Sequence, residues 1–146
     1  MKINLGCGDE KLLGYTNLDS VEELKPDILH DLDDMPWPFE DESAEEINAA
    51  DVYEHVADPL AFMNECWRIL EKEGILKIRS TCWETEQSYT DPTHRRFLTL
   101  NSFDYWDKKT PFGKKYWWYS KNKYDILSKN RDGQELVFVL RKRTGR

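Results

Sequence analysis

The stretch Ile3-Asn4-Leu5-Gly6-Cys7-Gly8-Asp9 carries the clearest fold signal in this chain. Its first residues alternate in polarity as a short strand does, and the two glycines then give the backbone the freedom for a sharp turn. A strand that ends in a glycine turn places backbone N–H groups at the carboxyl edge of a parallel sheet, where a ligand can approach without meeting a Cβ. The stretch therefore predicts a ligand-binding edge in an α/β sheet.

Two further short strands are predicted, and each ends in an acid: Tyr15 to Asp19 and Asp27 to Asp31. The carboxylate of Asp19 would lie beside the glycine turn, and its two oxygens can accept hydrogen bonds from both hydroxyls of a ribose. Only Asp9 to Gly14 separate the first two strands. A parallel crossover usually needs about a dozen residues. We therefore predict a shortened first crossover, in preference to a different position for the second strand.

The strongest helix signal begins at Asp58, which can cap a helix, and Pro59, which suits its first position. Apolar residues then recur at helical spacing, namely Leu60, Met63, Trp67 and Leu70. Gly74 is predicted to end the helix. The next segment, Ile75 to Ile78, reads as a central parallel strand with apolar residues on both faces.

The remaining segments complete an alternating α/β pattern. The prolines of Met35 to Phe39 predict a rigid connector, and Glu45 to Ala50 reads as a strand. A short helix is expected around Ser102 to Trp106, and Tyr124 to Leu127 with Glu135 to Leu140 form a predicted antiparallel hairpin. The fold class is therefore α/β, with a mostly parallel Rossmann-like sheet that closes with a hairpin.

Composition predicts a single domain spanning residues 1–146 in a soluble, cytoplasmic protein. Domains of about 100 to 150 residues are the commonest. No apolar run approaches the roughly 18 residues of a membrane span, and the first residues do not resemble a signal peptide. The three cysteines are widely spaced, and His30, His55 and His94 lie far apart in the sequence. This spacing predicts neither disulfides nor a metal site.

The net charge of −7 is unevenly distributed. Residues 1–93 contain 7 basic and 23 acidic side chains, whereas residues 94–146 contain 14 and 5. A basic half can mark a surface for phosphate-bearing partners such as nucleic acid. Alternatively, the two halves attract each other or are simply solvated.

Two common nucleotide-binding motifs are incomplete or missing. Lys11 stands where the third glycine of G-x-G-x-x-G belongs, so nicotinamide binding is disfavoured. No G-x-x-x-x-G-K-[ST] loop occurs.

A larger set of short motifs runs along the chain from the glycine turn to the strand after the predicted helix. The set is Leu5-Gly6-Cys7-Gly8, Asn17-Leu18-Asp19, His30-Asp31-Leu32, Glu54-His55-Val56, and Glu65 to Leu70 before Gly74-Ile75-Leu76. This set resembles class I methyltransferases that use S-adenosylmethionine, in particular the small methyltransferase type 11 group. The resemblance covers about residues 3 to 107, and the hairpin is similar to the pair that closes the family's sheet.

The resemblance implies an S-adenosylmethionine site at the carboxyl ends of the strands. Gly6, Cys7 and Gly8 would line the methionine part, Asp19 the ribose, Asp31 and Leu32 the adenine, and Ala50 and Asp51 the region of the sulfonium. Acidic strand ends beside a positive sulfonium are electrostatically favourable.

Methyl transfer depends mainly on orientation and exclusion of water, so a catalytic side chain is not obligatory. If a base is used, His55 and His94 are the candidates, because imidazole titrates near neutral pH. Each could instead be structural. Arg95 and Arg96 could bind an anionic acceptor or hold the acidic half of the chain in place.

Lys114 to Lys121 interleaves basic and aromatic residues, as in surfaces that stack on nucleic-acid bases. Aromatic residues are also the usual material of a core. The sequence therefore favours a methyltransferase with a small polar or anionic acceptor. Two alternatives stay open: a non-catalytic module or partner subunit, and a protein that binds nucleic acid through its basic half.

Overall fold

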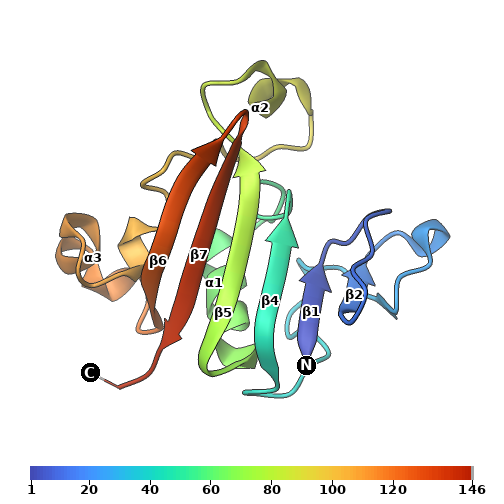
Figure 1. Ribbon diagram of the computed structural model, residues 1–146, viewed down its shortest axis with the longest axis horizontal. Helices are drawn as coiled ribbons and strands as arrows, with labels where there is room; N and C mark the ends of the chain where they lie inside the picture. The colour runs from blue at the N-terminus through green and yellow to red at the C-terminus, as the bar shows by residue number, and fades with distance from the viewer. Residues whose placement is uncertain (146) are drawn as a thin grey trace.

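The computed structural model describes residues 1–145 and shows a seven-stranded sheet, with α1 (Pro59–Ile69) behind it and α2 (Glu86–Thr90) beyond the upper ends of its longest strands (Figure 1). The order across the sheet is β3-β2-β1-β4-β5-β7-β6. Neighbours from β3 to β5 are parallel, whereas β7 is antiparallel to both β5 and β6. The strands are β1 (Lys2–Leu5), β2 (Thr16–Asp19), β3 (Ile28–Leu29), β4 (Ala44–Ala50), β5 (Leu70–Thr81), β6 (Lys123–Asp132) and β7 (Glu135–Arg143). The predicted mostly parallel sheet and closing hairpin are confirmed.

The helices are few and short. They are α1 (Pro59–Ile69), α2 (Glu86–Thr90) and α3 (Pro111–Lys115), with 3-10 turns at Glu22–Leu24, Asp104–Trp106 and Trp117–Tyr119. The short helix predicted around Ser102 to Trp106 is present as the 3-10 helix Asp104–Trp106. None of the helices in residues 1–145 is long and apolar enough to cross a membrane.

The first crossover is shortened, as predicted. Strands β1 and β2 pair in parallel, and no helix lies between them among the described residues. Two buried asparagines stabilise the connecting loop. The Asn4 amide donates to Glu10 O (3.1 Å) and to Asn17 Oδ1 (3.0 Å), and Asn17 Oδ1 also accepts from Leu12 N (2.9 Å). Side-chain hydrogen bonds thus satisfy loop backbone groups that a helix would have satisfied internally.

The apolar core lies on one face of the sheet only. Along β5, the side chains of Leu76, Ile78 and Ser80 are buried against the helices, whereas Lys77 and Arg79 are exposed or half-buried on the other face. Ile75 shares the open face with them, so apolar residues do occur on both faces as predicted, but no helix covers this face within the described chain. The strand alternates, which is the pattern of a sheet with one solvated face.

Ion pairs replace apolar packing on the open face. Lys77 pairs with Glu46 (3.1 Å) across β5 and β4, and Arg141 of β7 pairs with Glu73 (3.3 Å). Exposed pairs of this kind contribute little stability, typically about 0 to 1 kcal/mol. They do provide a polar surface that needs no covering layer of helices.

Helix α1 begins as predicted, because Asp58 Oδ1 accepts a hydrogen bond from Ala61 N (3.0 Å) and Pro59 is the first helical residue. Its buried stripe differs from the prediction: Leu60 is exposed, and the core side is formed by Phe62, Met63, Cys66 and Ile69. These four side chains supply most of the apolar contact between α1 and the sheet.

Gly74 does not end α1, which stops at Ile69, where the backbone becomes extended and continues into β5. The need for glycine at this position is steric. A Cβ on Gly74 would lie 2.9 Å from Glu71 O and 3.2 Å from Ala44 O. The glycine therefore allows the close approach of β5 to the start of β4.

The connector between β3 and β4 is irregular, as its prolines predicted, and α1 holds it from the other side. Trp37 is buried, and its backbone N–H donates to Glu65 Oε1 (2.8 Å). Arg68 donates to Phe39 O (2.9 Å) and pairs with Asp41 (2.7 Å). Two side chains of α1 thus fix a segment that contains no helix within the described chain.

Candidate active site

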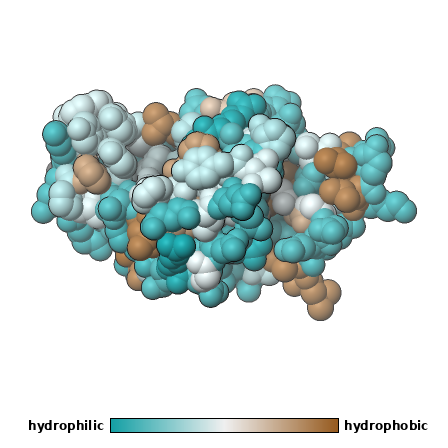
Figure 2. All heavy atoms as spheres, turned by 90° about the horizontal axis from the view of Figure 1, so that it is seen from above, coloured by the Kyte–Doolittle hydropathy of each residue, from teal (hydrophilic) through white to brown (hydrophobic). Residues whose placement is uncertain are grey.

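The carboxyl ends of β1, β2 and β4 surround a cavity of about 560 Å³. Its lining includes five of the predicted cofactor residues, namely Gly6, Asp19, Asp31, Leu32 and Asp51. A cavity of this size is in the usual range for small-molecule sites. Seen from above, this edge of the molecule is largely hydrophilic (Figure 2).

The glycine turn lies close to the loop after β4. Gly6 has a φ of +57°, and a Cβ at this position would lie only 2.5 Å from Val52 Cγ2. The backbone conformation and the lack of space therefore both require glycine. Gly8 also has a positive φ, and its N–H donates to Asp19 Oδ2 (2.8 Å). This hydrogen bond joins the glycine turn to the acid at the end of β2.

Acidic groups dominate the cavity wall. Asp19 Oδ1 accepts from Val21 N (3.0 Å), and each oxygen of this carboxylate has a further lone pair available. The carboxylates of Asp31, Asp33 and Asp51 line the same cavity. A ligand with hydroxyl donors and a positive charge fits this wall, and S-adenosylmethionine has both.

Cys7 and Ala50 lie on the other side of the glycine turn. They line a cavity of about 310 Å³ on the open face of the sheet, between the loop after β1 and strand β5. Gly6 borders both cavities. The assignment of Cys7 and Ala50 to the cofactor stays a prediction, as does that of the other site residues.

A second cavity, of about 580 Å³, adjoins the first at the carboxyl edge. Asp51 and His55 line both cavities. Asp51 has a φ of 57°, an unusual value for a residue other than glycine, and its carboxylate pairs with Arg79 (2.8 Å). Strained residues of this kind concentrate at functional sites. The second cavity is therefore placed to hold a molecule that reacts with a ligand of the first.

The structure brings His55 and His94 together across 38 intervening residues. Their rings are in edge-on contact, with centroids 4.7 Å apart. Asp91 is adjacent, with its Oδ2 3.7 Å from His94 Nε2. Sequence spacing predicted no metal site, but the fold brings two imidazoles and a carboxylate into a group that could ligate a metal ion.

Glu54 is a functional candidate that the sequence did not single out. Its side chain is 1% exposed and its Oε2 accepts a hydrogen bond from the Ser80 hydroxyl. Burial raises the pKa of this carboxyl to about 7, and the charge of Asp51 adds to the increase. Burial and the neighbouring His94 lower the pKa of His55. Only the fold reveals that the carboxyl of Glu54 is buried.

Arg96 fixes the loop that contains His94. Its guanidinium donates to Tyr53 O (2.5 Å) and Val56 O (2.6 Å), and it lies over the Tyr53 ring. Of the two roles considered for Arg95 and Arg96, Arg96 therefore holds the acidic half of the chain in place. Arg95 is exposed.

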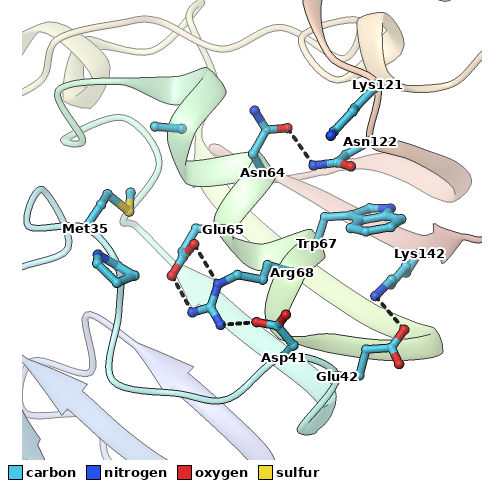
Figure 3. A pocket seen from close by; sticks show the side chains of 12 residues that line it. Met35, Asp41, Glu42, Asn64, Glu65, Trp67, Arg68, Lys121, Asn122 and Lys142 are labelled. Carbon is cyan, nitrogen blue, oxygen red and sulfur yellow. Dashed lines mark hydrogen bonds and ion pairs between the residues drawn. The ribbon is translucent and has the colours of Figure 1, made fainter.

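A larger cavity, of about 770 Å³, lies on the outer side of α1, away from the glycine turn (Figure 3). Its charged groups other than Lys121 already have partners. Arg68 binds Glu65 and Asp41, and Lys142 donates to Leu70 O (2.6 Å) while lying 4.0 Å from the centre of the Trp67 ring. This groove stabilises the connector and the end of β7, and we do not assign the chemistry to it.

The segment Lys114 to Lys121 is not a strand but continues from α3 into a 3-10 turn. Trp117 is 67% exposed and Trp118 is 59% exposed, so these rings are not part of the core. Tyr119 stacks on Tyr116 and on Tyr105, and the rings of Tyr116 and Tyr105 contact each other at a tilt. The aromatic residues therefore pack among themselves on the surface.

Comparisons with known proteins agree with this geometry. Residues 15–78 match the family profile described as "Methyltransferase domain". No curated protein sequence has significant similarity to the chain.

Among solved structures, an S-adenosylmethionine-dependent methyltransferase from Thermotoga maritima is 16% identical, with a TM-score of 0.68 over 97% of this chain and 82% of its own. A Haloferax volcanii protein solved in complex with the Trm112 methyltransferase activator is 13% identical, with a TM-score of 0.68 over 97% and 81%. The [4+2]-cyclase SpnF is 12% identical, with a TM-score of 0.64 over 99% and 75%.

These matches establish the fold. The chain therefore has the fold of S-adenosylmethionine-dependent methyltransferases, and its residues 15–78 match the methyltransferase domain family.

Proposed function

We propose that this chain transfers the methyl group of S-adenosylmethionine to a small polar acceptor bound in the cavity beside His55 and His94. The observation that carries the proposal is that Asp51 and His55 line both cavities at the carboxyl edge. A cofactor in one cavity and an acceptor in the other would meet at these two residues. Proximity and orientation of this kind supply a large part of the rate of a displacement reaction.

The cofactor supplies a methyl group on a positively charged sulfonium. In the proposal, Asp19 binds the ribose hydroxyls, Asp31 and Leu32 border the adenine, and the glycine turn leaves room for the methionine part. Asp51 contributes negative charge where the two cavities meet. These assignments are supported by the lining of one cavity by the glycine turn and all three acids.

The acceptor cavity narrows the choice of substrate. Its lining includes the acids Asp51, Asp91 and Glu135 as well as the two imidazoles. Carboxylates repel an anion, so this lining favours a neutral or cationic polar acceptor over an anionic one. In the proposal, His55 and His94 orient the attacking atom, and one of the two rings accepts its proton.

The test is calorimetric titration of the purified protein with S-adenosylmethionine and S-adenosylhomocysteine. We expect micromolar affinity that falls at least about tenfold in Asp19→Ala, because the loss of charge-assisted hydrogen bonds costs about 1.5 to 3 kcal/mol. Glu22→Ala is the matched control, since Glu22 is an exposed acid outside the cavity. Unchanged binding in Asp19→Ala would exclude the assignment of this residue. No binding of either ligand would favour a non-catalytic module, or one that a partner completes, as in the Haloferax volcanii complex.

The surface aromatic residues support a second candidate function, binding of nucleic acid. Trp117, Trp118 and Tyr119 are exposed beside Lys114 and Lys115. Stacking on bases combined with phosphate contacts would give an affinity that falls steeply with added salt. Fluorescence anisotropy with labelled single-stranded RNA at low and high salt tests this candidate, and no binding at low salt would exclude it.

A further inference from the structure

His55, Asp91 and His94 converge between the two cavities at the carboxyl edge. His55 belongs to the loop after β4, and the other two residues belong to the loop after α2. One potential ligand atom from each residue lies within 4.8 Å of the other two. We propose that these three side chains bind a divalent transition-metal ion, which in turn holds a hydroxyl oxygen of the methyl acceptor. The second half of this inference rests on the proposed function, whereas metal binding does not.

Hydrogen bonding fixes the tautomer of His94 in the form that a metal requires. Its Nδ1 lies 2.7 Å from Ser88 O. A carbonyl oxygen can only accept, so Nδ1 carries the proton and Nε2 keeps its lone pair. Nε2 is also the atom that faces Asp91 Oδ2, at 3.7 Å. A ring that donates to a backbone carbonyl through one nitrogen and ligates through the other is the usual arrangement of a metal-bound histidine.

The same reasoning applies to His55. The Thr93 hydroxyl donates its one proton to Asp91 Oδ1 (2.7 Å), so its oxygen is an acceptor for the ring of His55. Nδ1 of His55 lies 2.9 Å from that oxygen and therefore carries the proton. The lone pair of His55 is on Nε2. Thr93 thus orients two of the proposed ligands at once, a typical role for a residue that supports a metal site.

Glu54 gives an independent indication that a positive group belongs here. Its side chain is 1% exposed, and its Oε1 has no hydrogen-bond partner within the described residues. This oxygen lies 3.9 Å from His55 Nε2, the nitrogen with the free lone pair. A buried carboxylate oxygen without a partner is costly. A cation ligated by His55 would lie near it and offset that cost.

The donor set indicates the kind of ion. Imidazole ligands suit Zn²⁺, Fe²⁺, Ni²⁺ and Cu²⁺, whereas Mg²⁺ and Ca²⁺ prefer oxygen donors. Tetrahedral bonds of about 2.0 to 2.2 Å place donor atoms roughly 3.3 to 3.5 Å apart, so the three groups must move closer together on binding. The side chains of Asp91 and His55, which are 43% and 33% exposed, have room for this movement.

Three protein ligands leave at least one coordination position open. The three residues line the cavity of about 580 Å³, so an acceptor in that cavity could fill the open position. Coordination lowers the pKa of a bound hydroxyl, which favours its nucleophilic form. With the ion in place, His55 and His94 would act as its ligands, and the proton of the coordinated hydroxyl would pass to water, which reaches the cavity past the exposed residues Gln87, Thr90 and Pro92.

The test is titration of chelator-treated protein with Zn²⁺ by calorimetry and with Co²⁺ by visible absorption, which reports the ligand field directly. We expect one ion per chain, at least about tenfold weaker binding in His55→Gln and Asp91→Asn, and a smaller loss in Thr93→Val. Asp132→Asn is the matched control for Asp91→Asn, because Asp132 is an exposed acid on β6 that is not part of the cluster and should not affect the metal.

Circular dichroism confirms that each variant is folded, and Asp91→Asn is the variant least able to disturb the core because its side chain is exposed. Absence of stoichiometric binding, or equal affinities for wild type and both ligand variants, would overturn the metal site. Titration of the metal-free protein with S-adenosylmethionine separates the two proposals. Cofactor binding without metal binding refutes only the metal site, and metal binding without cofactor binding refutes only the proposed function.

Discussion

Substitution of Gly6 by Ala tests whether the loop after β4 sets the shape of the glycine turn. Alanine at a φ of +57° costs about 1 to 2 kcal/mol, because its Cβ approaches the neighbouring carbonyl. The added Cβ would also lie 2.5 Å from Val52 Cγ2, and overpacking of this kind costs typically 1 to 3 kcal/mol. We therefore expect Gly6→Ala to lower the free energy of unfolding by about 2 to 5 kcal/mol.

Gly8→Ala separates the two contributions. Gly8 has a similar φ of +53°, but a Cβ there would meet nothing within 4 Å. Its expected cost is the backbone contribution alone, about 1 to 2 kcal/mol. The difference between the two glycine variants therefore measures the steric contact with Val52.

Val52→Ala completes a double-mutant cycle with Gly6→Ala. Alanine at position 52 lacks both γ carbons, and the new Cβ of residue 6 would then lie 3.6 Å from the Cβ of residue 52, an ordinary contact. The double variant should be more stable than the sum of the single changes predicts, by about 1 to 3 kcal/mol.

Equilibrium unfolding in urea, monitored by tryptophan fluorescence, measures the stability of the wild type and of the four variants. Equal destabilisation by Gly6→Ala and Gly8→Ala, with no coupling to Val52, would refute the steric argument. Cofactor titration of the same variants provides a second measurement. The double variant should regain stability but not full affinity, because the backbone of residue 6 stays strained.

Two further predictions concern charged groups outside the two cavities at the carboxyl edge. Burial raises the pKa of Asp125, but hydrogen bonds from Lys109, Arg141 and Arg143 outweigh this and lower it to about 2. Because the folded pKa lies below the unfolded value, this stabilisation is present above about pH 4 and is lost as the pH falls toward 2. The unfolding free energy of the wild type should therefore fall by about 1 kcal/mol more than that of Asp125→Asn between pH 5 and pH 3, and identical pH profiles in urea titrations would contradict the assignment. Arg68→Ala should cost about 3 kcal/mol because it leaves the buried carboxylate of Glu65 without its cation. The exposed Lys72→Ala is its control, and similar melting temperatures for the two variants would count against this role of Arg68.

Local signals in the sequence predicted their structures well. The cap at Asp58, the glycine turn after β1 and the hairpin of β6 and β7 each depend on residues close together in the chain. Their chemistry acts over a few residues, so a single sequence contains the information. The short first crossover followed from chain length alone.

Contacts between distant segments were the source of the errors. Gly74 was expected to end a helix, but its role depends on the carbonyl of Ala44, thirty residues earlier. The cluster of His55 with His94 depends on a loop that Arg96 fixes by hydrogen bonds to two carbonyls. No local pattern encodes either contact.

The open face of the sheet could have been predicted. Residues 76–80 alternate strictly between core and open face, and that alternation is visible in the sequence as Leu-Lys-Ile-Arg-Ser. The expectation of a covered parallel sheet, typical of this fold class, took precedence over the local pattern. Where apolar and polar residues alternate along a strand, that pattern is better evidence of which face of the strand is buried than the fold class is.

Polar side chains position the candidate site in places where the described chain has no helices. Asn4 and Asn17 hold the loop after β1, and Arg68 holds the connector before β4. Arg96 ties the loop of His94 to the segment after Tyr53. Each of these side chains bonds to backbone carbonyls or N–H groups, so a single substitution frees a whole segment rather than one contact. The carboxyl edge can therefore present two adjoining cavities, but its geometry should be unusually sensitive to these few polar residues.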